Sequence, residues 1–217
     1  MLKTNEGKFF AVSALLALVL VGAGLAKRGA ANRVSTAEEE IVTPLPPGVT
    51  ASDALNGANP ALGPDDAPYT IVEFGDYQCP PCAQAYTFLN DLIKHGNGQA
   101  RLVFRNYPLT NLHPNALNAA LVAEAAGEQG KFWAMHDLLY TQPDRLSVAD
   151  LNQAAETMHL DLPRFHQSLR RPAKARVRAD LAAVERLKIT GTPALLLCEP
   201  GGSVRAISMA ELQRRFR

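Results

Sequence analysis

Cys79-Pro80-Pro81-Cys82 stands between a strand-like segment, residues 69–74, and a helix-like segment, residues 83–94. The first turn of a helix offers unpaired backbone N–H groups and the positive end of the helix dipole, and both favour a thiolate. Cys79 is placed to receive both effects, and Cys82 lies one turn further along the same face. The spacing therefore predicts a nucleophilic thiol at Cys79 and a resolving thiol at Cys82, a pair suited to thiol-disulfide exchange.

A zinc site is the alternative interpretation of two cysteines at this spacing. Zinc needs a second pair of ligands, and the sequence holds no other CxxC and no HxxxH pattern. The motif and its context therefore favour redox chemistry, with no metal and no organic cofactor.

Two further positions carry candidate site residues. Glu73 lies in an otherwise apolar strand, where a buried carboxylate is costly unless it has a task or a partner; the alternative is a surface glutamate at a strand edge. Thr192 and Pro193 precede the apolar residues 194–197, so the proline falls at the first residue of a strand, where its missing N–H is tolerated. A cis peptide bond at this point would be a structural feature that the sequence alone does not reveal.

Four ordered motifs in residues 65–217 resemble the DsbA-like branch of the thioredoxin superfamily. They are Val72-Glu73-Phe74-Gly75-Asp76-Tyr77-Gln78-Cys79-Pro80-Pro81-Cys82, Phe104-Arg105-Asn106-Tyr107-Pro108-Leu109 followed by His113-Pro114, Gln129-Gly130-Lys131-Phe132-Trp133-Ala134-Met135-His136-Asp137-Leu138-Leu139, and Gly191-Thr192-Pro193.

The resemblance implies a role for each matching residue. Cys79 would attack, Cys82 would resolve, and Thr192 with Pro193 would contact the client peptide. Pro80 and Pro81 are expected on the same client-binding surface, and Glu73 would take the proton of Cys82. Arg105 would stand where some relatives carry a lysine paired with the buried acid.

Pro81 departs from the strongly oxidising members of this branch, which carry a histidine between the cysteines. Proline supplies neither a positive charge nor an N–H donor, so one source of thiolate stabilisation is missing. A less stabilised thiolate predicts a milder oxidant.

The N-terminal region predicts export. Residues 9–26 form an uncharged run rich in Leu, Val and Ala between basic residues, which is typical of a membrane-directing segment within residues 1–28. A retained anchor is favoured on length, and cleavage after the small residues near 24–26 is the alternative. Residues 29–64 are rich in Ala, Pro and Gly and predict a flexible linker. The net charge of +1 argues against a nucleic-acid partner.

Residues 65–217 predict an α/β domain, a thioredoxin fold with a helical insertion at about 113–171. Phe132, Trp133, Met135 and Leu139 recur at helical spacing, which favours core packing over a peptide-binding surface. His113 is either close to the redox site, by resemblance, or solvated at a helix start. Cys198 lies in an apolar strand and is expected to be buried and inert.

These observations predict an extracytoplasmic oxidoreductase, tethered by its N-terminal helix, that introduces disulfides into exported proteins. A client thiolate would attack the Cys79–Cys82 disulfide, and a membrane redox partner would reoxidise the dithiol. Two alternatives use the same residues: a reductase or isomerase with reversed electron flow, and a non-catalytic protein that holds a metal or a peptide.

Overall fold

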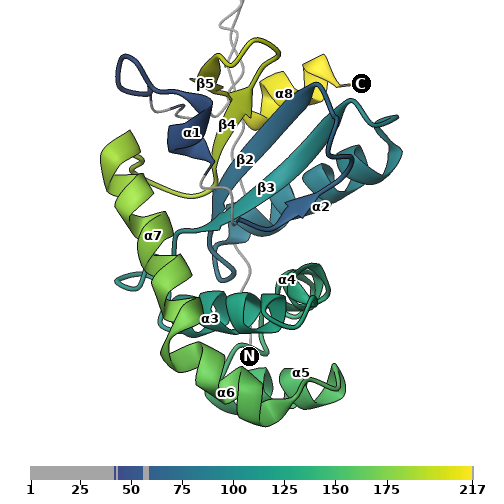
Figure 1. Cartoon of the computed structure of the whole chain (residues 1–217), viewed down its shortest axis with the longest axis vertical. Coiled ribbons are helices and arrows are strands. Elements are labelled where there is room, and N and C mark those ends of the chain that lie inside the picture. Colours follow the sequence, from purple (N-terminus) through teal and green to yellow (C-terminus); the bar gives the residue numbers. More distant parts are fainter. Residues whose placement is uncertain (1–41, 43, 56–58, 217) are drawn as a thin grey trace, which may run out of the picture. The chain divides into compact units, whose positions relative to one another are not determined.

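The computed structural model describes residues 42, 44–55 and 59–216, and its centre is a mixed sheet of five strands in the order β1-β3-β2-β4-β5 (Figure 1). The strands are β1 Ala61–Leu62, β2 Tyr69–Gly75, β3 Ala100–Asn106, β4 Ala194–Cys198 and β5 Val204–Ala206. β2 pairs in parallel with β3 and antiparallel with β4. The strand that leads to Cys79 is therefore central and is held on both edges.

Alternation along β2 divides its side chains between two covered faces. Ile71 packs with α2 (Pro80–His95) and α8 (Met209–Arg215). Val72 and Phe74 face the opposite side, where they pack with α7 (Pro172–Leu187) and α1 (Ala51–Ala54). A strand with helices on both faces explains the nearly continuous apolar run at this point of the sequence.

The predicted helical insertion consists of four helices below the sheet in Figure 1. They are α3 Ala116–Gly127, α4 Phe132–Thr141, α5 Val148–Thr157 and α6 Leu162–Arg170. Phe132, Met135 and Leu139 are buried in one apolar cluster with Cys79 and Cys82, and Trp133 packs against it. Core packing is therefore confirmed for this stretch, and the insertion supplies one wall of the redox site.

Two boundaries differ from the sequence predictions. α2 begins at Pro80 instead of residue 83, because prolines are tolerated at the first helical positions, where the backbone N–H has no partner within the helix. The predicted linker of residues 29–64 is wrong at its C-terminal end. Leu45, Val49 and Leu55 pack against the α7 side of the domain, and β1 pairs with β3. Isolated apolar residues among prolines hid this packing in the sequence.

Residues 1–41 lie outside the described part of the chain, so the predicted membrane-directing segment at 9–26 and the start of the linker have no structural description. None of the helices in the part of the chain that the structure describes could span a lipid bilayer.

Candidate redox site

The two cysteines occupy the beginning of α2. Cys79 is the N-cap residue, and Pro80 and Pro81 follow at the first two helical positions. The Cys79 backbone N–H donates to the Asp76 carbonyl oxygen at 3.1 Å, which closes a tight turn after β2. Because prolines have no N–H, two of the donors that a helix start would offer to Cys79 are missing.

Thr192 lies against Cys79 although it is far away in sequence. The Cys79 thiol donates to the Thr192 carbonyl oxygen at 3.4 Å, and the Thr192–Pro193 peptide bond is cis. Cys79 and Cys82 are both free thiols in this structure. Cys79 is 6% exposed and Cys82 is 0% exposed, so of these two buried residues only Cys79 keeps some contact with solvent.

The pKa values of the two thiols are shifted in opposite directions. A hydrogen bond from the Cys82 side chain is the main cause that lowers the pKa of Cys79 to about 6. Burial raises the pKa of Cys82 far above its ordinary value, and the hydrogen bond with Cys79 adds to the effect. At neutral pH the site therefore holds one thiolate and one thiol, the state that exchange through Cys79 requires.

Glu73 is fully buried on β2, and neither of its carboxyl oxygens has a hydrogen-bond partner among the described residues. Burial, and next the charge of Cys79, raise the pKa of Glu73 to about 8. A carboxyl group with this pKa exchanges protons close to neutral pH, as a group that serves Cys82 must do.

Alkylation of reduced protein by iodoacetamide is expected to show a single reactive thiol with a pH midpoint of about 6. The rate should fall about tenfold for each pH unit below the midpoint, because only the thiolate reacts. Cys79→Ser should remove the reactive phase of alkylation, and a midpoint near 9 would contradict the assignment.

The same shift affects folding stability. Since the pKa of Cys79 lies below the ordinary value of 9, the reduced protein gains stability as pH rises from about 6 towards 9, and loses it as pH falls through 6.

Arg105 does not pair with Glu73, which corrects the role implied by the resemblance. Its Nε donates to Asp180 Oδ1 at 2.8 Å, and both side chains are almost completely buried. β2 alternation explains the difference: Arg105 contacts Phe74, whose side chain faces the side opposite to Glu73. Arg105 therefore ties β3 to α7 and leaves Glu73 without an arginine partner.

The Asp180 carboxylate extends this pairing into a buried polar network. It accepts from the Asn106 backbone N–H at 2.9 Å, and the Asn106 side chain donates to Glu124 at 2.8 Å. Burial is the main cause that raises the pKa of Glu124 to about 7. The network connects the sheet with α3 and α7. Sequence reasoning did not identify it, since three of its members come from segments far apart in the chain.

Asp76 is a second residue that sequence reasoning did not single out. Its carboxylate is buried, accepts from the Gln78 and Leu109 backbone N–H groups at 2.8 Å each, and lies 2.8 Å from His113 Nδ1. This decides the open question about His113, which sits beside the turn that precedes Cys79. The signal in the sequence was the polar residue directly after a buried strand.

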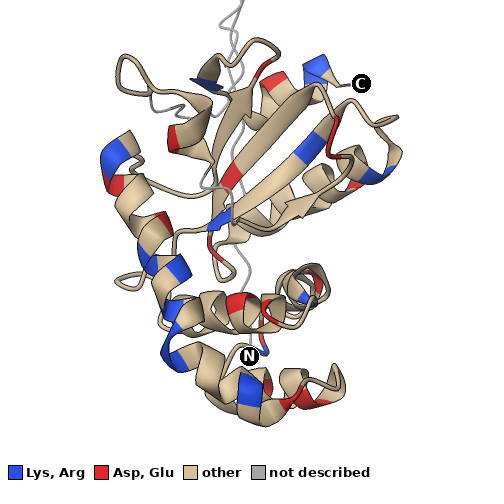
Figure 2. Cartoon of the chain, in the orientation of Figure 1, with Lys and Arg blue, Asp and Glu red and all other residues tan. Residues whose placement is uncertain are grey.

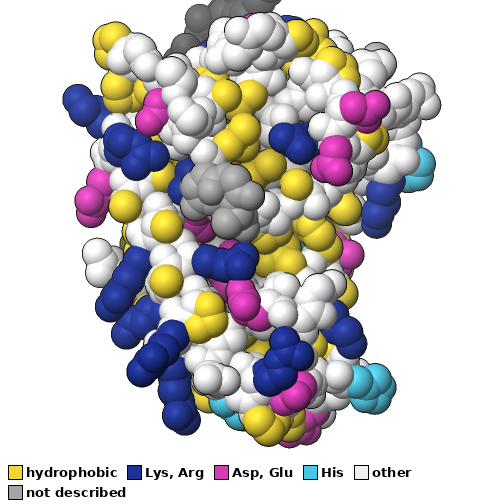
Figure 3. Space-filling model, viewed as in Figure 1, with side chains coloured by type: hydrophobic (Ala, Val, Ile, Leu, Met, Phe, Trp, Pro, Cys, Tyr) yellow, Lys and Arg dark blue, Asp and Glu magenta, His cyan; other side chains and the backbone are white. Residues whose placement is uncertain are grey.

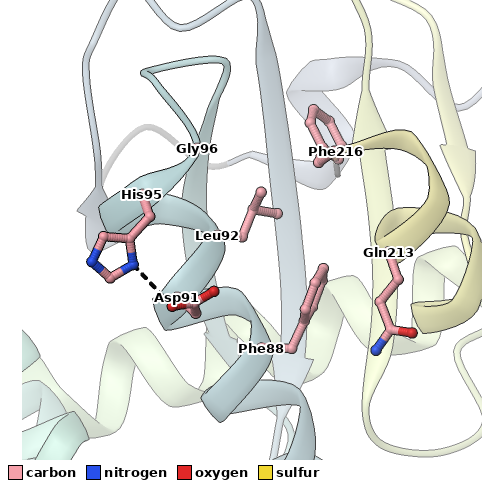
Figure 4. Close-up of a pocket in the computed structure, with 7 residues that line it drawn as sticks. All are labelled: Phe88, Asp91, Leu92, His95, Gly96, Gln213 and Phe216. Carbon is pink, nitrogen blue, oxygen red and sulfur yellow. Dashed lines mark hydrogen bonds and ion pairs between the residues drawn. The ribbon is translucent and has the colours of Figure 1, made fainter.

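A pocket of about 330 Å³ lies at the opposite end of α2 from Cys79, between α2 and α8 (Figure 4). It is lined by Phe88, Asp91, Leu92, His95, Gly96, Gln213 and Phe216. His95 Nδ1 and Asp91 Oδ1 lie 2.9 Å apart, and the dashed line in Figure 4 marks this contact. The pocket therefore contains no residue of the thiol site.

Two further features are the third cysteine and a run of basic residues on α6 and α7. Cys198 is buried in β4, and burial raises the pKa of its thiol to about 11, which fits an inert cysteine. Figure 2 shows Lys and Arg recurring along α6 and α7, and Figure 3 shows them gathered on one edge of the surface. Of these, Arg176 pairs with Glu128 at 2.7 Å.

A dithiol at a helix start, next to a cis-proline loop and above a buried acid, defines the site of a thioredoxin-type fold. Residues 55–213 match the protein-family model described as Thioredoxin. The chain belongs to this family, and it shares its fold with solved DsbA-like proteins.

Solved structures support the same classification. A thioredoxin-like oxidoreductase from Silicibacter pomeroyi is 27% identical, with a TM-score of 0.65 over 76% of this chain and 95% of its own. The thiol-disulfide exchange protein α-DsbA2 from Wolbachia pipientis is 20% identical with a TM-score of 0.63, over 76% of this chain and 89% of its own. BdbD from Bacillus subtilis is 22% identical with a TM-score of 0.60, over 77% of this chain and 93% of its own. The last two show that the fold is shared.

Curated relatives are much longer proteins. The chain is 45% identical over 132 residues to Na⁺/H⁺ antiporter NhaA 3 from Salinispora tropica, a match that covers 60% of this chain and 20% of the antiporter. NhaA 1 from Salinispora arenicola is 44% identical with the same coverage. The chain thus spans about a fifth of the length of these relatives.

Proposed function

We propose that this protein is an extracytoplasmic thiol-disulfide oxidoreductase that introduces disulfides into exported proteins through Cys79 and Cys82. The observation that carries the proposal is the opposite shift of two neighbouring thiols: the pKa of Cys79 is lowered to about 6, whereas burial raises that of Cys82. Cys79 is therefore suited to form a bond with a client sulfur and to leave again as a thiolate. Cys82 is shielded from competing reactions.

The proposed cycle begins when a client thiolate attacks the Cys79 sulfur of the oxidised pair. A bond forms between client and Cys79, and the electron pair of the broken disulfide leaves on the Cys82 sulfur, which takes a proton from Glu73. A second client thiolate then attacks the client sulfur and releases Cys79 as a thiolate. Thr192 and Pro193, together with Pro80 and Pro81, form the surface that the client contacts.

Location and partners rest on the sequence outside the described residues. Residues 9–26 direct the chain to the membrane, so we place the catalytic domain on the extracytoplasmic side, where disulfides persist. A membrane redox partner reoxidises the dithiol. Ion transport is not proposed for this chain, because the antiporters share only a fifth of their length with it.

Turnover with a reduced, unfolded client tests the proposal. Oxidised protein should form client disulfides faster than glutathione disulfide alone, and catalysed reduction of insulin at a higher rate than client oxidation would favour the reductase alternative. No catalysis in either direction would favour a protein that only holds a peptide or a metal. The reduction potential, measured by equilibration with glutathione, decides the direction of electron flow.

Pro81→His is expected to make the protein more oxidising. Histidine restores a backbone N–H at the second position of α2 and adds a side chain that donates or carries a positive charge, and both favour the Cys79 thiolate. A more stable thiolate stabilises the reduced form. The reduction potential should rise by about 30 mV for each tenfold change in the equilibrium constant, and an unchanged or lower potential would contradict the argument.

A further inference from the structure

Three buried polar atoms of β2 and α4 lack a hydrogen-bond partner among the described residues: both carboxyl oxygens of Glu73 and the hydroxyl of Tyr140. Glu73 is 0% exposed and Tyr140 is 4% exposed. Buried polar groups in folded proteins are normally paired with protein or with ordered water. These three atoms therefore indicate that a polar interaction has a function within an otherwise apolar region.

The three atoms lie on the same side of the sheet. Glu73 and Gly75 are two residues apart on β2, so they face the same side. A Cβ atom added to Gly75 would lie 2.9 Å from the Tyr140 hydroxyl. The Phe104 ring, whose nearest atom would lie 2.6 Å from the same Cβ, and the Tyr140 hydroxyl together fill the place where a side chain at residue 75 would stand, on the face of the strand that also carries Glu73.

Cys82 borders the same region. It belongs to the apolar cluster that contains Tyr140, and the charges of Glu73 and Cys82 act on Tyr140 in addition to its burial. Burial raises the pKa of the Tyr140 hydroxyl well above its ordinary value. The group therefore keeps its proton and remains a hydrogen-bond donor throughout the pH range in which thiols exchange.

Ring packing does not account for the hydroxyl. The Tyr140 ring stacks on Tyr86 with centroids 5.1 Å apart, and lies 4.8 Å from Tyr77 and 5.0 Å from His136. Phenylalanine would make the same ring contacts without burying an unpaired polar atom.

We propose that Tyr140 is a positioning residue for proton transfer in the redox cycle: its hydroxyl donates a hydrogen bond, through one water molecule, to the ionised Glu73 carboxylate. The inference rests on the proposed function. When Cys82 releases a mixed disulfide, its S–H bond breaks and the proton passes to Glu73. The Cys82 sulfur bonds to Cys79, and the electron pair of the Cys79–client bond leaves on the client sulfur. Tyr140 stabilises the form of Glu73 that accepts this proton.

Tyr140→Phe tests the proposal in protein carrying a glutathione mixed disulfide on Cys79. Release of glutathione should rise with pH through the pKa of Glu73, and the variant should move this midpoint upward by about one unit, because a hydrogen bond to a charged group is lost. Release at pH 7 should slow about tenfold. In the same variant, the pH midpoint of Cys79 alkylation and the melting temperature should not fall.

Tyr86→Phe is the matched control, since its hydroxyl donates to Asp137 and its ring stacks on Tyr140. The control should keep the midpoint of release. In a Glu73→Gln background, Tyr140→Phe should have no further effect on release. An unchanged midpoint in Tyr140→Phe, or an equal shift in both tyrosine variants, would overturn the inference.

The same experiment separates this inference from the proposed function. If the unaltered protein forms no mixed disulfide with glutathione, the thiol-exchange proposal fails together with the role of Tyr140. If the mixed disulfide forms and resolves normally but Tyr140→Phe changes nothing, only the role of Tyr140 is wrong.

Discussion

Cys82→Ser is expected to accumulate mixed disulfides between Cys79 and client proteins and to lose essentially all turnover. The variant keeps Cys79, which retains 6% exposure at the start of α2, but it has no second thiol to release a trapped client. Non-reducing electrophoresis and mass spectrometry of the cross-linked peptide would identify the attached cysteine. Clients joined through Cys79 are the expected result.

Two matched variants are controls for the mixed-disulfide experiment. Cys79→Ser should form no client complex, because the remaining Cys82 is completely buried and burial raises its pKa. Cys198→Ser removes the third thiol, which lies in β4 and has a pKa raised to about 11, and should leave turnover unchanged. Trapping of clients through Cys82 in the Cys79→Ser variant would refute the assignment of nucleophile and resolving thiol.

Glu73→Gln is expected to slow release of the mixed disulfide by about 10²-fold, the lower range for loss of a general base. Glutamine has nearly the same shape but cannot accept the proton of Cys82. The pH dependence at about 8, which belongs to the carboxyl group, should disappear. Single-turnover release from the Cys79 mixed disulfide measures the rate, and alkylation of Cys79 should still be fast.

The same variant is expected to be more stable than the unaltered protein at neutral pH. The pKa of Glu73 is raised from 4.5 to about 8, so the folded state binds more protons than the unfolded state between these values. Stability is therefore lost as pH rises through this window. At pH 7 the loss is about 3 kcal/mol at most, and glutamine removes it. Urea unfolding at pH 5 and pH 7 would show whether the difference grows with pH.

Glu124→Gln is the control for both effects, because Glu124 is also buried and its pKa is also raised, to about 7, but its partner is Asn106. It should change the pH dependence of stability and leave mixed-disulfide release unaffected. If Glu73→Gln released clients at the normal rate, the carboxyl group would be a buried structural acid and Cys82 would lose its proton by another route.

Local patterns explain why so much of the site was predictable. A cysteine that follows a buried strand and precedes two prolines acquires a helix start from residues that are its neighbours in sequence. The apolar run of β2 and the helical spacing of Phe132 and Leu139 likewise predict burial without knowledge of distant contacts. The burial of Glu73 belongs to this class, since it follows from its place in the strand.

Pairings across the chain were predicted less well. Arg105 was assigned to Glu73 by resemblance, yet strand alternation directs its side chain to Asp180, 75 residues away, on α7. The end of the linker was also misplaced, because a few scattered apolar residues become a packed segment only when β3 and α7 are there to receive them.

The sequence by itself determined the local features of the candidate site: two thiols at a helix start, a carboxyl group inside a strand, and a proline directly before another strand. Those features depend on residues close together in the chain, where hydrogen bonding and side-chain alternation are set locally. Only the tertiary structure decided that Thr192 meets Cys79 across 113 residues and that the Tyr140 hydroxyl lies against Gly75 beside the Phe104 ring. Contacts of this kind exist only after distant elements have packed, because close packing of the whole core selects which side chains share a site.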